Sequence, residues 1–227
     1  MSKFAERSMQ IISNEGVLGL KKRIVSHLIH RPLFINLYIF ELEYKNLVDI
    51  SSPIFDIEVG KVNQSDMDTL ATLAKFAFYG HSAEEIARYL AEGQECYVAI
   101  NKNQVISCYW RIAGYYYDHY LKRGLVLAEN EEYVFGAFTE KEFRGLSIFP
   151  LLLAKSSSER RSKNFDLRAF SFIRTNNKAS QLSFSKLGFE KVGHIGFIDI
   201  LGIRFNYLLG KRALPKTHKR TFINVNF

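Results

Sequence analysis

The segment Thr139–Leu153 brings together residues that can hold an anion. A predicted strand ends here, a short turn with Arg144 and Gly145 follows, and an apolar helix begins. The first amides of a helix lack internal partners and carry partial positive charge, so they form a cradle for anions. Gly145 permits close backbone approach, Arg144 adds a cation, and Pro150 suits the first helical turn. The segment therefore predicts either a phosphate site or a surface turn that leads into a core helix.

A second segment, Asn177–Phe189, could position a polar side chain at the start of another helix. The predicted helix begins at Asn177, ends with Gly188 in the C-cap position, and is followed by a strand from Phe189. On its own, Asn177 is interpreted as an N-cap.

The two segments, about 30 residues apart, together resemble the signatures of the GCN5-related N-acetyltransferase (GNAT) superfamily. The first signature reads Arg/Gln-x-x-Gly-x-Gly/Ala after an aromatic residue, and Phe143, Arg144 and Gly145 match it. Ser147 and Phe149 stand where that family usually has small, glycine-type residues. The second signature, Asn-x-x-Ala/Ser with a later Lys-x-Gly-Phe, is met by Asn177, Ser180, Lys186, Gly188 and Phe189. The resemblance covers roughly the C-terminal two-thirds of the chain.

The resemblance implies acetyl-coenzyme A (acetyl-CoA) as the co-substrate. Its pyrophosphate would bind the backbone amides of Arg144, Gly145, Leu146, Ser147, Ile148 and Phe149. The pantetheine arm would lie between two strands that splay apart in this family, and would pair with backbone groups of Ala137, Phe138 and Thr139. Asn177 would hydrogen-bond the arm, and Ser180 belongs to the same motif. The side chain of Phe149 is expected to narrow the cradle or to cover the cofactor.

The reaction that the resemblance implies is direct attack of an acceptor amine on the thioester in a ternary complex. The protein must then remove a proton from the ammonium and stabilise the leaving thiolate. In many relatives a tyrosine protonates that thiolate, but the matching residue here is Phe184, so Ser183 is the candidate acid beside other tyrosines or solvent. Glu131 and Glu132 open the strand beside the acyl site and are the candidate general bases, unless they form a solvated strand end.

An aromatic run between two predicted strands offers a place for the acceptor. Within the run 115–120, the residues Tyr117, Asp118 and His119 combine a ring with a titratable pair. They predict either an acceptor pocket or an exposed loop.

The elements that position these residues follow the order β-α-α-β-β-β-α-β-α-β-β after a Ser-Ser-Pro turn at 51–53. This order predicts an α/β (α+β) fold with a mixed sheet, and the resemblance makes it a GNAT acyl-CoA N-acyltransferase fold with an N-terminal helix-plus-strand extension. We predict an extension over 1–52, with helical structure in two pieces over 4–30 and a strand over 33–44. A GNAT domain over 53–210 and a basic tail over 211–227 follow.

Composition narrows the remaining possibilities. The 227 residues are 47% hydrophobic and 14% aromatic, which supports a substantial core and excludes wholesale disorder. The net charge of +8 resides in the two ends, because residues 1–31 carry +4 and residues 211–227 carry +5. Two cysteines, Cys96 and Cys108, are too few for a disulfide scaffold or a four-cysteine zinc site, and no metal is expected. We expect a cytoplasmic protein, since neither a spanning helix nor a secretory signal is visible.

These observations together predict a transferase, an N-acetyltransferase that acts on a small primary amine, with an amino sugar as the first example. Two other functions stay open: a CoA-binding module without turnover, and a nucleic-acid-binding protein that acts through its basic ends. No nucleic acid is expected as a partner, because the body of the chain is nearly neutral. The basic helix over 4–30 predicts either a peripheral membrane contact or packing on its own domain, and the extension also allows a homodimer.

Overall fold

The computed structural model describes residues 34–50, 56–76, 81–118, 120–121, 123–163, 166–200, 203–210 and 222–223. The helices are α2 (Met67–Lys75), α3 (Ala83–Ala91), α4 (Ile148–Lys163) and α5 (Lys178–Lys186), with 3-10 turns η1 (Tyr44–Asn46) and η2 (Lys141–Phe143). The strands are β1 (Phe34–Glu43), β2 (Glu58–Lys61), β3 (Glu95–Asn101), β4 (Gln104–Ala113), β5 (Tyr115–Asp118), β6 (Arg123–Val126), β7 (Glu131–Thr139), β8 (Arg168–Arg174), β9 (Glu190–Ile200), β10 (Ile203–Gly210) and β11 (Phe222–Ile223). The predicted α/β class with a mixed sheet is confirmed.

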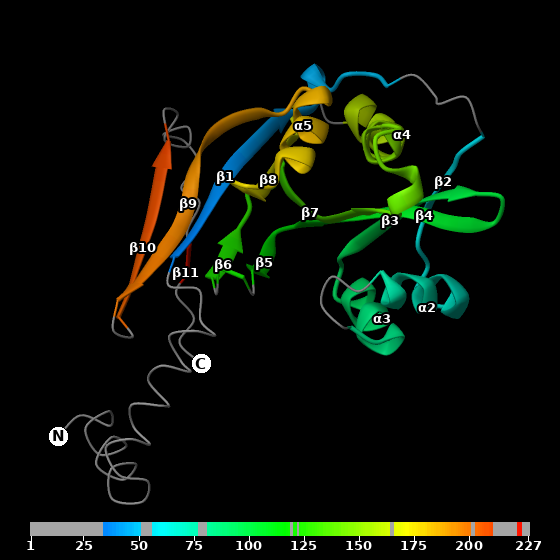
Figure 1. Ribbon diagram of the computed structural model, residues 1–227, viewed down its shortest axis with the longest axis horizontal. Helices are drawn as coiled ribbons and strands as arrows, with labels where there is room; N and C mark the ends of the chain where they lie inside the picture. The colour runs from blue at the N-terminus through cyan, green and yellow to red at the C-terminus, as the bar shows by residue number, and fades with distance from the viewer. Residues whose placement is uncertain are drawn as a thin grey trace, which may run out of the picture. The chain divides into compact units, whose positions relative to one another are not determined.

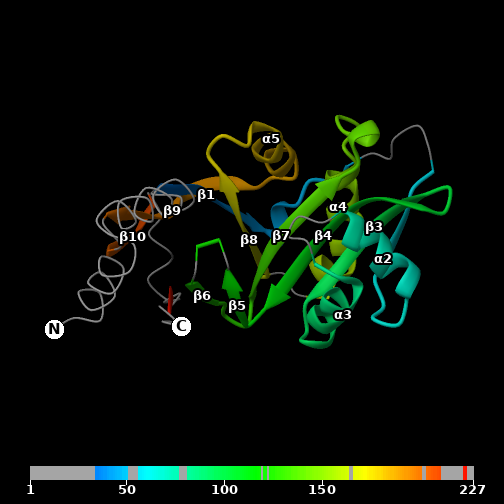
Figure 2. The ribbon, with the colours of Figure 1, turned by 60° about the horizontal axis from the view of Figure 1, so that its bottom comes forward.

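The chain forms two compact units, and the larger one comprises 37–195 and 208–227. Its main sheet has the order β9, β1, β8, β7, β4, β3, β2 (Figures 1 and 2). β7 and β8 run parallel, whereas β1–β8, β7–β4, β4–β3 and β3–β2 are antiparallel pairs. β5, β6 and β11 form a separate small antiparallel sheet. β1, assigned to the extension by sequence, thus lies between β8 and β9 within the main sheet.

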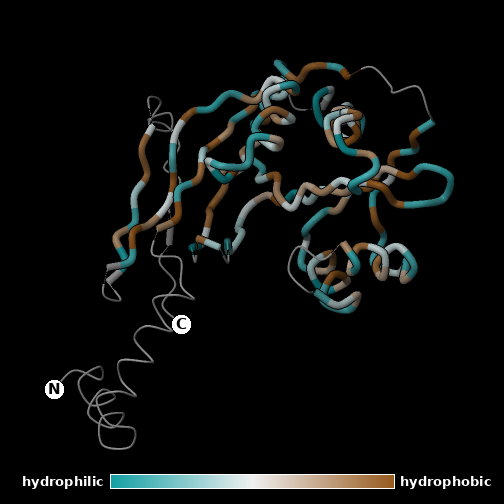
Figure 3. Tube along the Cα trace, viewed as in Figure 1, coloured by the Kyte–Doolittle hydropathy of each residue, from teal (hydrophilic) through white to brown (hydrophobic). Residues whose placement is uncertain are grey.

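Helices cover both faces of this sheet. α4 and α5 lie on one face, and α2 and α3 lie on the other (Figure 1). Successive side chains of a strand point to opposite faces of the sheet. Tyr97 and Tyr109 therefore pack under α4, whereas Cys96, Val98 and Cys108 pack under α2 and α3. Both hydrophobic and hydrophilic residues occur along the strands in Figure 3.

Local signals explain where the helices begin. Ser82 and Glu85 form a capping box at the start of α3, since the Glu85 amide donates to Ser82 Oγ at 3.3 Å and the Ser82 amide donates to the Glu85 carboxylate at 2.9 Å. α5 begins after Asn177, whose side chain accepts a hydrogen bond from the Ser180 amide at 3.1 Å. The predicted N-cap role of Asn177 is therefore confirmed.

The smaller unit contains, among its described residues, 34–36 and the segment Gly196–Tyr207. The ends of β9 and β10 pair here, and the Tyr207 hydroxyl donates to the Ile35 carbonyl at 3.0 Å. β9 runs unbroken through Gly193 and Gly196. An added Cβ at Gly196 would lie 1.9 Å from the Ile35 carbonyl oxygen, so these glycines mark close backbone approach rather than a break.

Several expectations concern residues outside the described part of the chain. The predicted helix over 4–30 and most of the basic tail lie there. Among the described residues, no helix is long and apolar enough to cross a membrane. Within the same residues, no cluster of His, Cys, Asp or Glu could hold a metal ion.

Candidate functional site

The predicted anion cradle lies between the end of β7 and the start of α4. η2 leads into Arg144, whose Nε donates to the Thr139 carbonyl at 2.9 Å and so closes the loop back onto β7. Gly145 has a φ of +82°, and a Cβ there would meet no atom within 4 Å. The first backbone bond at this end of α4 runs from the Leu151 amide to the Ser147 carbonyl at 3.0 Å. Pro150 has no N–H, and the Arg144 amide, predicted for the cradle, already donates to the Lys141 carbonyl at 3.3 Å. The amides of residues 145–149 are thus the helix-start groups that can donate to an anion.

Two cations lie beside this cradle. Lys186 reaches across from the last turn of α5 and places its Nζ 3.5 Å from Ser147 Oγ. The Arg144 guanidinium lies 5.7 Å from the centre of the Phe138 ring. Ser147 itself has a φ of +57°, in the left-handed region that normally requires glycine. The backbone therefore keeps the glycine-type conformation although the residue is serine.

Phe149 behaves differently from the expectation that it narrows the cradle or covers the cofactor. Its side chain is buried, with its ring centre 5.0 Å from that of Phe184 and 6.1 Å from that of Tyr109. The ring therefore packs into the core beneath α4 and leaves the cradle open.

β7 has one edge that is suited to an extended ligand. It pairs with β8 only from Glu131 to Tyr133, although β8 continues to Arg174 and β7 to Thr139. The predicted divergence of these two strands is thus present. Beyond Tyr133, the described residues provide no strand partner for this edge of β7. Free strand edges bind extended, amide-bearing chains.

A bulge in β7 lies on this stretch. The β4–β7 register shifts between Cys108–Phe138 and Trp110–Phe135, which leaves one extra residue in β7. Gly136 has a φ of +60°, and a Cβ there would approach Trp110 Cδ1 to 2.9 Å. The sequence interpretation missed this glycine, although an isolated glycine inside a strand is a recognised sign of a bulge. The carbonyls of Phe138 and Thr139 already accept hydrogen bonds from Ser107 and Arg144 side chains.

The second motif, Asn177–Phe189, offers fewer free polar side-chain groups than the sequence predicts. The Asn177 side-chain oxygen is occupied by the cap of α5, so its amide group is the part that remains to donate. Ser183 is half-buried next to Phe184, which is itself 3% exposed. Phe184 packs against the rings of Phe40, Phe149 and Phe189.

The two candidate bases, Glu131 and Glu132, are both only 1% exposed and lie in ion pairs. Glu132 accepts hydrogen bonds from the Tyr44 hydroxyl and from Arg160 at 3.0 Å. Glu131 accepts from the Ala128 amide at 3.2 Å and lies 3.7 Å from Arg168. Burial and the neighbouring Glu132 carboxylate raise the pKa of Tyr44. The geometry gives these carboxylates a charge-pairing role in place of the expected role as bases, because each is buried against arginine side chains.

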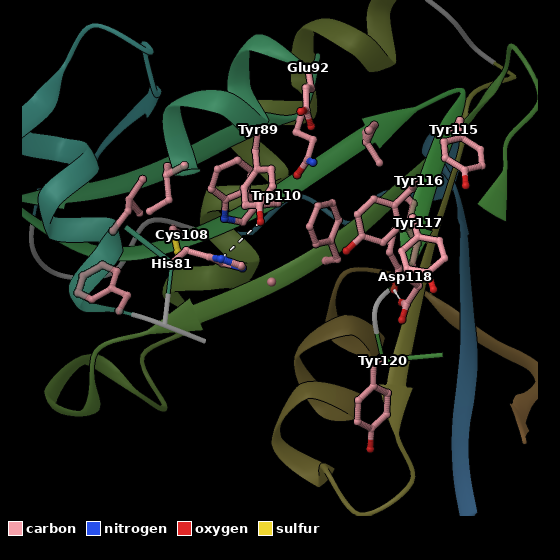
Figure 4. A pocket seen from close by; sticks show the side chains of 18 residues that line it. His81, Tyr89, Glu92, Cys108, Trp110, Tyr115, Tyr116, Tyr117, Asp118 and Tyr120 are labelled. Atoms are coloured by element: carbon pink, nitrogen blue, oxygen red, sulfur yellow. Dashed lines mark hydrogen bonds between the residues drawn. The ribbon is translucent and has the colours of Figure 1, made fainter. Parts of the chain in front are cut away.

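A cavity of about 630 Å³ opens on the face covered by α2 and α3. Of its eighteen lining residues, nine are Phe, Tyr or Trp. The lining residues lie in or directly beside α2, α3, β4, β5 and β7. Figure 4 shows the run from Tyr115 to Asp118 on one side of the cavity, and His81, Tyr89 and Cys108 on the other. Tyr117 and Asp118, both predicted for the acceptor pocket, lie on its wall, whereas His119 lies outside the described residues.

The polar groups of the cavity are held in defined positions. Asp118 is 8% exposed and accepts hydrogen bonds from the Leu121 amide at 2.7 Å and the Tyr133 hydroxyl at 3.3 Å. His81 Nδ1 lies 3.4 Å from the Tyr89 hydroxyl and 3.5 Å from the Glu85 carboxylate (Figure 4). Imidazole is the side chain suited to proton transfer near neutral pH.

Sequence reasoning missed both His81 and the strand character of the aromatic run. His81 precedes the capping box of α3, and nothing in its neighbours indicates a cavity. β5 and β6 are four-residue strands whose pairing depends on distant contacts, and so the run 115–118 gave no clear strand signal.

Cys108 lines the same cavity but is not a nucleophile. Burial raises the pKa of its thiol to about 12, so it stays protonated near neutral pH.

Comparison with known proteins was made in sequence and in structure. No family model matches the sequence, and no curated protein matches it. The structure is similar to an acetyltransferase of the GNAT family from Colwellia psychrerythraea, with a TM-score of 0.49 and 14% identity over 82% of this chain and 61% of that one. It is also similar to a GCN5-related N-acetyltransferase from Kribbella flavida (TM-score 0.44, 11% identity, 76% and 60% coverage).

An aminoglycoside acetyltransferase from an uncultured soil metagenomic sample, solved with sisomicin, is similar over 57% of this chain and 86% of its own (TM-score 0.43, 14% identity). The chain spans 55%, 64% and 62% of the length of three further similar structures. At these identities and TM-scores the likenesses carry no argument about activity, substrate or partners.

Proposed function

We propose that the chain is an N-acyltransferase that moves an acetyl group from acetyl-CoA to a primary amine of a small acceptor. The position of Gly136 carries the proposal, because this residue lines the cavity and precedes Thr139 by only three residues. The Thr139 carbonyl is held by Arg144 at the cradle. At roughly 3.3 Å per residue, the cavity wall and the cradle are about 10 Å apart along β7. A donor with its phosphates on the cradle can therefore present its far end to the cavity.

The residues present fit acetyl-CoA. The amides of residues 145–149, with the Arg144 and Lys186 side chains beside them, suit a pyrophosphate. The edge of β7 from Val134 to Thr139 suits the amide-bearing arm. When bound, the thioester supplies the activated acetyl group.

His81 is the proposed proton acceptor for the ammonium of the acceptor. It lies on the cavity wall together with Gly136, and Tyr89 and Glu85 fix the orientation of its ring through Nδ1. A neutral imidazole positioned in this way takes up a proton as the amine attacks. This assignment replaces Glu131 and Glu132, which lie in buried ion pairs.

A CoA-binding module without turnover is the second candidate. The observation that favours it is the ring cluster around Phe184, where a buried phenyl stands in place of the tyrosine hydroxyl of many GNAT relatives. The nucleic-acid alternative depends on the basic ends, most of which lie outside the described residues.

Calorimetric titration with acetyl-CoA and CoA, paired with an assay for released thiol, separates these functions. We expect micromolar binding, and thiol release when amines are supplied. Lys186→Ala should weaken donor binding, whereas Lys75→Ala, at the exposed end of α2, should not. His81→Gln should keep donor binding but lower the rate of thiol release by roughly 10²–10⁴-fold. Binding without thiol release from any amine would favour the module, and no binding by either compound would refute the donor site.

A further inference from the structure

We propose that the cavity selects a primary amine carried on a flat aromatic ring, with no anionic group on the molecule. This inference rests on the proposed function, since it names the acceptor class of the same site. Three features of the described cavity wall carry it: its rings, its charges and its polar groups.

The rings form a continuous wall rather than scattered side chains. Phe135 lies at its centre, 4.6 Å from Tyr116, 5.4 Å from Tyr133 and 6.5 Å from Trp110, measured between ring centres. The interplanar angles of Phe135 with Tyr133 and Trp110 are only 10° and 29°, so these rings lie nearly parallel. A further ring of the ligand can extend such a stack, and each pair of this kind contributes about 0.5–1.5 kcal/mol beyond its buried area.

The charges on the wall favour a cation. Glu92 and Asp118 are its carboxylates, and the described lining residues include neither lysine nor arginine. This wall is acidic although the whole chain carries a net charge of +8. Aromatic faces attract ammonium groups, and carboxylates add to that attraction. A carboxylate or phosphate on the ligand would instead meet two acids, and His81 is the one basic side chain among the described lining residues.

Most polar groups of the wall are single groups on aromatic rings, which do not match the ring of hydroxyls on a sugar. Apart from six tyrosine hydroxyls, the Trp110 indole N–H and His81, the described wall offers Glu92, Gln94 and Asp118 as polar side chains that can bind hydroxyl groups. Asp118 already accepts two hydrogen bonds, from Leu121 and Tyr133. A ring with several hydroxyl groups would leave donors and acceptors unpaired in the cavity, which costs free energy for each group. The amino sugar favoured by the sequence is therefore not the acceptor class that fits this wall.

The test uses the only tryptophan of the chain, Trp110, which lies on the cavity wall. The full chain is titrated with 2-phenylethylamine, phenylalanine and glucosamine, with excitation at the red edge of indole absorption. We expect 2-phenylethylamine to change the Trp110 emission saturably and to support thiol release from acetyl-CoA. Phenylalanine has the same ring and amine plus a carboxylate, and glucosamine has the amine without an aromatic ring. Both should bind at least tenfold more weakly.

Two substitutions locate the effect. Phe135→Leu should weaken 2-phenylethylamine binding about fivefold to tenfold, whereas Phe205→Leu, at an exposed ring of β10, should leave it unchanged. Glu92→Gln should weaken it about twofold to fivefold, whereas Glu58→Gln, at an exposed position of β2 away from the cavity, should not.

The outcomes separate this inference from the proposed function. Preference for glucosamine or phenylalanine would overturn the inference. So would the absence of any response to 2-phenylethylamine in a protein that binds acetyl-CoA by calorimetry, and in that case the donor site would stand. Saturable 2-phenylethylamine binding without acetyl-CoA binding would support the cavity's ligand class and refute the acyltransferase.

Discussion

Replacing Gly136 with alanine tests the bulge that joins the cavity to the donor strand. The residue has a φ of +60°, and its Cβ would approach Trp110 Cδ1 to 2.9 Å. A left-handed backbone costs a residue with a side chain about 1–2 kcal/mol. An extra methyl group forced against a packed wall costs about 1–3 kcal/mol more. We therefore expect Gly136→Ala to lower the free energy of unfolding by about 2–5 kcal/mol.

The matched control is Gly93→Ala. Gly93 has a φ of +91°, but a Cβ there would meet no atom within 4 Å. Its alanine variant should therefore lose only the backbone part, about 1–2 kcal/mol. Urea unfolding followed by circular dichroism measures both losses, and the fluorescence of folded Gly136→Ala should also differ from that of the native protein because the indole of Trp110 must move.

The difference between the two variants decides the question. Equal losses of stability, with unchanged Trp110 emission, would mean that Gly136 makes no close approach to the indole. The bulge would then not be fixed by this contact, and the link from cavity to cradle along β7 would lose its structural basis.

Three further predictions concern the cradle and the buried charges. Ser147→Gly should raise the free energy of unfolding by about 0.5–1 kcal/mol in chemical denaturation. Glycine removes the backbone strain of serine at a φ of +57°, and this gain exceeds the cost of the extra conformational entropy that glycine gives the unfolded chain. Lys186→Ala should weaken CoA binding about threefold to tenfold relative to Lys75→Ala, and calorimetry should find that the difference shrinks as salt is raised. Although burial opposes it, hydrogen bonds from Lys61 and Arg111 lower the pKa of Glu95 from 4.5 to about 2. Since the folded-state pKa is depressed, the stability that Glu95 contributes is full above about pH 4.5 and is lost as the pH falls towards 2. The free energy of unfolding, measured at several pH values in this window, should therefore change less with pH for Glu95→Gln than for the native protein.

The elements with strong local signals can be predicted from the sequence. The capping box at Ser82 specifies the start of α3, and Asn177 specifies the start of α5, because each motif satisfies helix amides within three residues. The β3–β4 hairpin follows from its short turn, where Lys102 and Asn103 adopt positive φ.

The parts that depend on long-range contacts were not predictable in this way. The placement of β1 between β8 and β9 depends on pairing across more than a hundred residues, for which the sequence of β1 carries no signal. His81 becomes part of a cavity only when α3 packs over β4. Glu131 and Glu132 looked like strand-end acids, but Arg168, Arg111 and Arg160 reach them from distant positions.

The two departures from the GNAT signatures at Phe149 and Phe184 are one structural feature. Their ring centres lie 5.0 Å apart, and both rings are buried in the cluster under α4 and α5. A small residue at 149 would leave a void beside Phe184, and a hydroxyl at 184 would enter a wall of rings where it lacks an evident partner. Filling such a void and avoiding an unsatisfied buried hydroxyl each favour the phenyl pair. The pair therefore closes the core on the cradle side of the sheet, and the proton chemistry of the proposed reaction falls to the opposite face, where His81, Tyr89 and Gly136 meet in one cavity.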